Sequence, residues 1–115
     1  MRMFRRDFIA AGALALLGTA PALAQQGRKA AARAPVILVV GDSLSAEYGL
    51  PRGSGWVALL EKRLAQEKIG ATVVNASVSG DTTAGGRARL PALLKQHSPT
   101  HVVIELGGND ALRGL

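Results

Sequence analysis

The chain has 115 residues and no cysteine, and 14 Lys and Arg against 8 Asp and Glu give it a formal net charge of +6. Without cysteine the chain forms no disulfide, and thiol redox chemistry and all-cysteine metal sites are excluded. The basic residues are scattered and the chain has only one Trp and one Tyr, so no pattern supports nucleic-acid binding.

Residues 1–24 have the three parts of an export signal. A basic start with Arg5 and Arg6 precedes an apolar stretch at residues 9–17, and Ala-Leu-Ala at residues 22–24 resembles a cleavage site. The apolar stretch is shorter than the roughly 20 residues that a membrane span needs. Paired arginines favour the twin-arginine route, with an ordinary secretory signal or a retained anchor as alternatives. We therefore expect a periplasmic or secreted protein without stable membrane insertion after signal removal.

The rest of the chain is expected to form one small α/β domain. Residues 25–34, rich in Ala and polar side chains, are interpreted as a linker, and residues 35–115 as the folded part. Apolar runs at residues 35–40, 72–75 and 101–106 predict strands, and helical patterns lie between them. This alternation predicts a parallel sheet with right-handed crossovers. About three strands would leave an edge unpaired and a helix layer unfinished, so we expect the N-terminal part of a larger domain.

The helix limits are predicted from capping residues and breakers. Ser54 is expected to cap the first helix, with Gly70 as its stop and Trp56 in the core. Pro91 is expected to restart the second helix as a first-turn residue, because proline disrupts a helix interior. A third helix is expected from Ala111 onward.

Each predicted strand leads into a turn of small polar residues, which suggests a site at the carboxyl edge of the sheet. A serine hydrolase needs an exposed hydroxyl, a base to take its proton, and donors aimed at the developing oxyanion. Ser43 offers the hydroxyl, Gly80 a backbone N–H that a substrate oxygen can approach closely, and Asn109 a side-chain amide.

These turns resemble the three blocks of the GDSL, or SGNH, hydrolase family. The blocks are Gly-Asp-Ser-Leu-Ser at 41–45, Asn-Ala-Ser-Val-Ser-Gly-Asp-Thr at 75–82 and Gly-Gly-Asn-Asp at 107–110. The resemblance covers about residues 36–115. The stretches at 88–97 and 105–110 look closest to the bacterial periplasmic multifunctional subgroup of arylesterases, acyl thioesterases and lysophospholipases.

The resemblance implies a flavodoxin-like three-layer sandwich, of which about three strands are present. It also implies that Ser43 is the nucleophile, that Gly80 and Asn109 form the oxyanion hole, and that the substrate is a small acyl ester or thioester. It implies no metal and no cofactor.

The family's fourth landmark, an Asp-x-x-His that supplies the orienting acid and the base, has no counterpart in the 115 residues. His97 and His101 flank the amino end of the third predicted strand, about 17 Å from its other end, whereas a base must lie within about 3 Å. Asp42 and Asp110 are interpreted as positioning the Ser43 and Asn109 loops. We therefore expect a fragment with little activity alone.

Two alternatives remain open at this point. Gly-rich turns at helix N-termini also hold phosphates, so a non-catalytic ligand- or phosphate-binding module is the second hypothesis. Neither Gly-x-Gly-x-x-Gly nor a Gly-Lys-Ser/Thr loop is present, however. Glu47, Tyr48 and Arg52 either border the acyl pocket or lie on an ordinary solvated loop.

Overall fold

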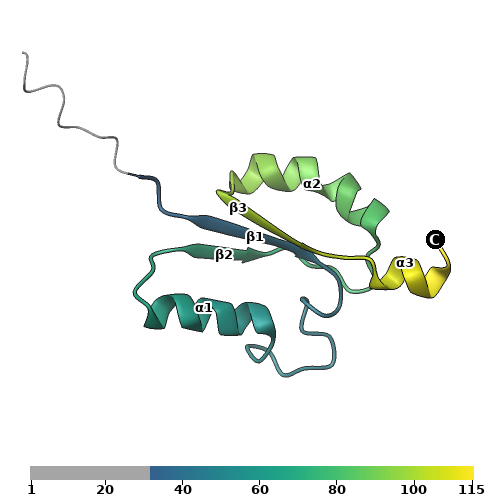
Figure 1. Cartoon of the computed structure of the whole chain (residues 1–115), viewed down its shortest axis with the longest axis horizontal. Coiled ribbons are helices and arrows are strands. Elements are labelled where there is room, and N and C mark those ends of the chain that lie inside the picture. The colour runs from purple at the N-terminus through teal and green to yellow at the C-terminus, as the bar shows by residue number, and fades with distance from the viewer. Residues whose placement is uncertain (1–31) are drawn as a thin grey trace, which may run out of the picture. The chain divides into compact units, whose positions relative to one another are not determined.

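The computed structural model describes residues 32–115, so the predicted signal at 1–24 and most of the predicted linker lie outside the described residues. Strands and helices alternate along the chain, as the apolar pattern predicted (Figure 1). In chain order they are β1 (Val36–Gly41), α1 (Trp56–Gln66), β2 (Thr72–Asn75), α2 (Thr83–His97), β3 (His101–Glu105) and α3 (Gly108–Arg113).

The sheet has the order β2-β1-β3, and β1 pairs in parallel with both neighbours. Helix α1 lies on one side of the sheet and α2 on the other (Figure 1). Because β1 is central and covered on both faces, its side chains Leu38, Val39 and Val40 are buried. The predicted parallel α/β architecture is therefore confirmed, and its core is centred on β1.

Strand β3 pairs only with β1 among the described residues, so its outer edge carries no strand there. Its apolar side chains are accessible: Val102, Val103 and Ile104 are 40%, 37% and 60% exposed. An apolar edge of this kind normally pairs or is covered. The prediction of an unpaired edge and exposed apolar surface is thus confirmed for the described part of the chain.

Helix α1 differs from its prediction at both ends. Gly55, not Ser54, precedes its first residue, and the Ser54 hydroxyl donates instead to the carbonyl of Pro51 at 2.6 Å. The helix ends at Gln66, before Gly70, because Lys68 takes the left-handed conformation (φ +56°) in which a helix cannot continue. Trp56 is 37% exposed, so its predicted place in the core is wrong.

Helix α2 is continuous across Pro91, so the predicted restart is wrong. Proline leaves the carbonyl four residues earlier, at Arg87, without its helical N–H donor. Both residues are exposed, so water can serve that carbonyl. Helix α3 begins at Gly108, three residues before the expected Ala111, directly after Gly107 turns the chain at φ +122°. No helix within residues 32–115 combines the length and apolar character needed to cross a membrane.

The long loop between β1 and α1 is held by the carboxylate of Glu47. It accepts hydrogen bonds from the backbone N–H of Gly55 at 3.0 Å and from that of Gly53 at 2.9 and 3.0 Å. These backbone donors, with a smaller effect of Arg52, favour the charged form and hold the pKa of Glu47 below its usual value of 4.5. The loop is therefore pinned to the start of α1 by a negative charge.

This pinning predicts an acid-dependent stability. Because folding lowers the pKa of Glu47, its contribution is complete above about pH 4.5, the unfolded value, and is lost as the pH falls through the lower folded pKa. Glu47→Gln should lower the melting temperature at pH 7 and flatten its fall below pH 4.5, as measured by circular dichroism. Glu61→Gln, on the exposed face of α1, is the control. A Glu47→Gln protein with an unchanged acid profile would contradict the assignment.

Candidate active site

The Ser43 turn follows β1 and is organised by Asp42, a buried carboxylate. The Asp42 side chain accepts from Leu44 N–H at 2.9 Å, and its carbonyl accepts from the N–H groups of Ser45 and Ala46 at 3.2 and 3.0 Å. The hydroxyl of Ser43 makes no hydrogen bond to any residue between 32 and 115. The turn thus holds a serine whose oxygen is open to a base and a substrate.

Asn109 lies in the first turn of α3, beside the Ser43 turn. Its amide nitrogen donates to the carbonyl of Asp81 at 2.8 Å and lies 3.4 Å from the carboxylate of Asp42. Both Ser43 and Asn109 line a cleft of about 360 Å³, whose other lining residues are Asp42, Leu44, Gly108 and Leu112. The structure therefore brings these two predicted site residues together.

Gly80 adopts φ +81°, a conformation that favours glycine, although open space surrounds the position where a Cβ would lie. Its N–H donates to no residue of the described part, and its carbonyl accepts from Arg113 Nη2 at 3.0 Å. Gly80 does not line the Ser43 cleft. It is linked to that cleft through Asp81, the next residue, whose carbonyl receives the Asn109 amide.

The two aspartates predicted to position loops do so through different partners. Asp42 contacts both the Ser43 turn and Asn109, as predicted. Asp110 instead accepts from the hydroxyl of Thr83 at 2.6 Å and from its N–H at 2.9 Å, which fastens α3 to the start of α2. These hydrogen bonds, of which the one from the hydroxyl has the larger effect, hold the pKa of Asp110 below its usual value of 3.8.

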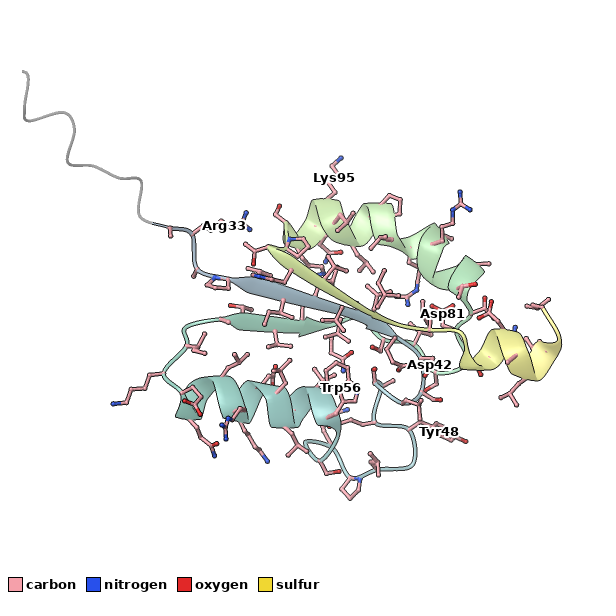
Figure 2. The ribbon with its side chains drawn as sticks, viewed as in Figure 1. Arg33, Asp42, Tyr48, Trp56, Asp81 and Lys95 are labelled. Atoms are coloured by element: carbon pink, nitrogen blue, oxygen red, sulfur yellow. The ribbon has the colours of Figure 1, made fainter. Side chains whose placement is uncertain are left out.

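Asp81 fixes the turn after β2. Its carboxylate pairs with Arg89 of α2 at 2.7 Å, and Arg89 also donates to the carbonyl of Ala76 at 2.7 Å. Figure 2 shows Asp42 and Asp81 at the carboxyl end of the sheet, on the side of α3. The turn that follows β2 is thus tied to α2 and α3 by short hydrogen bonds, whereas the turn that follows β1 meets α3 through the longer contact of 3.4 Å between Asp42 and Asn109.

The two histidines lie where the sequence placed them, away from this edge. His97 ends α2, and His101 begins β3 opposite Ile37, four residues before Gly41 ends β1. Neither is near the Ser43 turn. Within residues 32–115, no group of three or more His, Asp or Glu side chains could hold a metal ion.

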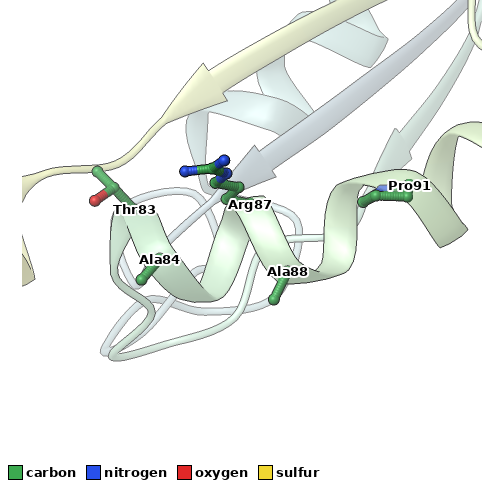
Figure 3. Close-up of a pocket in the computed structure, with 5 residues that line it drawn as sticks. All are labelled: Thr83, Ala84, Arg87, Ala88 and Pro91. Carbon is green, nitrogen blue, oxygen red and sulfur yellow. The ribbon is translucent and has the colours of Figure 1, made fainter.

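Two larger cavities contain none of the three predicted site residues. The largest, about 740 Å³, is lined by α2 alone, through Thr83, Ala84, Arg87, Ala88 and Pro91 (Figure 3). The other, about 600 Å³, is lined by Ala46, Glu47, Leu50, Arg52, Asn75 and Ser77. Glu47 and Arg52 therefore border a cavity, although not the one that contains Ser43, and Tyr48 is 76% exposed.

A polar cluster of Ser45, Trp56 and Glu105 adjoins the Ser43 turn, and no sequence pattern predicted a role for it. The hydroxyl of Ser45 donates to Glu105 Oε1 at 2.7 Å and accepts from Trp56 Nε1 at 2.9 Å. Glu105 stands opposite Gly41 in the parallel register, so a side chain from the end of β3 reaches the turn after β1. The contact between Ser45 and Glu105 could be predicted only if the register of β1 and β3 were known, and the sequence does not give this register.

Comparison with known proteins places these features in a family. Residues 39–115 match the model of the GDSL-like Lipase/Acylhydrolase family. The chain is 57% identical over 110 residues to the esterase TesA of Pseudomonas aeruginosa (strain PAO1), a match that covers 96% of this chain and 50% of that protein. It is also 57% identical over 84 residues to the thioesterase 1/protease 1/lysophospholipase L1 of Escherichia coli (strain K12), covering 73% of this chain and 39% of that protein.

A crystal structure of TesA has the same fold over the matched region. The TM-score is 0.68 at 66% identity, and the match covers 70% of this chain and 44% of that one. The chain thus spans half or less of the length of these relatives. The family match, the fold and the paired Ser43 and Asn109 turns agree, and the chain belongs to the GDSL, or SGNH, hydrolase family.

Proposed function

We propose that the whole protein containing this chain is an exported serine hydrolase that cleaves small acyl esters, thioesters or lysophospholipids. The observation that carries the proposal is the cleft in which Ser43 and Asn109 meet at the carboxyl edge of the sheet. The names of the esterase and thioesterase relatives support the substrate class. The pattern of residues 1–24 supports export to the periplasm through the twin-arginine route.

The proposed reaction is a two-step acyl transfer. Ser43 Oγ bonds to the carbonyl carbon while its proton passes to a general base, and the bond to the alcohol or thiol leaving group breaks. The leaving group takes the proton from the base. Water, deprotonated by the same base, then attacks the acyl carbon. The bond from that carbon to Ser43 Oγ breaks, the carboxylic acid leaves, and the base returns its proton to Oγ to restore the hydroxyl.

The oxyanion of each tetrahedral intermediate would be held by the donors of Gly80 and Asn109. The N–H of Gly80 has no partner among the described residues, and is therefore available. One N–H of Asn109 bonds to the carbonyl of Asp81, which orients the amide. The other is 3.4 Å from Asp42, a distance at which a hydrogen bond is weak, so a substrate oxygen can compete for it.

The general base is proposed to lie outside residues 1–115. Within the described residues nothing bonds to the Ser43 hydroxyl, and His97 and His101, the two histidines of the sequence, lie at the opposite end of β3 and β1. The relatives are also about twice as long as the matched region. Without a base, an oxyanion hole and binding alone leave a residual acceleration of about 10³–10⁴-fold over water, so these residues by themselves should hydrolyse esters only weakly.

Covalent labelling of the whole protein with an organophosphonate tests the nucleophile. We expect mass spectrometry to show one phosphonyl adduct, on Ser43. Attack of a serine oxygen on the phosphorus requires an activated hydroxyl beside an oxyanion hole. Ser43→Ala should abolish the adduct, while Ser54→Ala, in an exposed loop, should leave it unchanged. Absence of labelling in the unsubstituted protein would favour the non-catalytic binding module instead.

Asn109→Ala tests the oxyanion donor. Removing one such donor typically lowers kcat about 10²–10³-fold, and we expect this loss in p-nitrophenyl ester hydrolysis by the whole protein. KM should change much less, because the donor acts mainly on the charge that develops in the transition state. Gln96→Ala, on the exposed side of α2, is the control. An Asn109→Ala protein with unchanged kcat would remove Asn109 from the mechanism.

A further inference from the structure

The cluster formed by Ser45, Trp56 and Glu105 joins three separate elements under the Ser43 turn. Ser45 is only 1% exposed, and its hydroxyl uses both of its hydrogen-bonding roles at once, as donor to Glu105 and acceptor from Trp56. The backbone carbonyl of Ser45 also accepts from the amide of Asn75, at the end of β2, at 2.7 Å. One residue of the turn is therefore fastened to β3, α1 and β2.

Packing leaves this hydroxyl little freedom. A Cβ added at Gly41 would lie 2.7 Å from Ser45 Oγ, 2.8 Å from its Cβ and 3.0 Å from Ser77 Oγ, so the hydroxyl occupies the space that the glycine leaves open. Glu105 faces that space across the β1–β3 register. The hydrogen bond to a carboxylate is of the strong, charge-assisted kind, which makes it suited to hold a turn.

The two ends of this contact each lead to a residue of the proposed site. Ser45 lies two residues after Ser43, and Glu105 lies four residues before Asn109. We infer that Glu105 and Ser45 are positioning residues, whose hydrogen bond holds the nucleophile turn against the end of β3, the strand that leads into the α3 turn with the oxyanion donor Asn109. The inference rests on the proposed hydrolase function. Small displacements of reacting groups, of about 1 Å, can cost about 10²-fold in rate, so this contact should matter although it touches no substrate.

Substitutions in the whole protein test the inference through the rate of phosphonate labelling and through kcat for p-nitrophenyl ester hydrolysis. Glu105→Ala and Ser45→Ala should each lower both rates about 10²-fold with KM changed less than about threefold. Glu105→Gln keeps an oxygen acceptor for Ser45 and should retain activity within about tenfold. The double variant should lose no more than either single one, because both remove the same contact.

Two further measurements separate positioning from a general loss of structure. Trp56 is the one tryptophan of the 115 residues, and its indole N–H signal, assigned with Trp56→Phe, should shift in the NMR spectrum of Ser45→Ala. Glu67→Ala removes a surface carboxylate directly after α1 that pairs with Arg63 at 3.0 Å, and should change neither the rates nor the signal. Circular dichroism at the assay temperature establishes that each variant is folded.

The outcomes are distinct. The positioning role would be overturned if the losses in Ser45→Ala and Glu105→Ala multiply in the double variant. It would also be overturned if Glu105→Ala folds and its kcat is within threefold of that of the unsubstituted protein. If Glu105→Ala does not fold, the kcat of Ser45→Ala is compared with that of the unsubstituted protein instead, with the same threefold limit. If the unsubstituted protein is not labelled, the proposed hydrolase function is overturned, and this inference with it. If it is labelled but substitution of Ser45 or Glu105 leaves the rates unchanged, the inference alone is overturned.

Discussion

The parallel pairing of β1 with both of its neighbours is the constraint on which the rest of the structure depends. Parallel strands end at the same edge of a sheet, so the turns that follow β1, β2 and β3 are gathered there whatever the lengths of the connecting helices. The buried side chains of β1 are apolar, and the strand lies between α1 on one side of the sheet and α2 on the other. The site is therefore a consequence of the sheet's direction.

At that edge, hydrogen bonds made by side chains set the finer geometry. Asp42 fixes the turn that carries Ser43, and the amide of Asn109 is oriented by the carbonyl of Asp81. Ser45 fastens the same turn to Glu105. Such bonds are directional, so together they hold the turns as one unit. The buried hydroxyl of Ser77, in the turn after β2, is an exception that has no hydrogen-bond partner among the described residues. The Gly80 N–H and the Ser43 hydroxyl are left without partners among the described residues, which agrees with the roles proposed for them.

Sequence patterns predicted which helices and strands form better than they predicted the residues at which the helices begin and end. Apolar residues located the strands of the described part. The unbroken run of β1 follows from its cover on both faces, whereas the apolar run of β3 is exposed among the described residues. The helix limits failed where local rules compete with neighbouring contacts. Ser54 is a good capping residue in isolation, but its hydroxyl bonds to the carbonyl of Pro51. Pro91 lies inside a continuous α2, at an exposed position of the helix. Trp56 was expected in the core, yet its ring is partly exposed while its N–H is used by Ser45.

The sequence by itself determined the α/β class, the three polar turns and the family, because these depend on local composition and on residue order. It also separated both histidines from the Ser43 turn, because strand length alone sets that distance. Only the tertiary structure decided which turns touch. Ser43 and Asn109 share a cleft, and Glu105 reaches Ser45 across the register of β1 and β3. Gly80 does not line the cleft, but its neighbour Asp81 accepts a hydrogen bond from Asn109. Contacts between residues some sixty positions apart depend on strand register and packing, which no local pattern encodes.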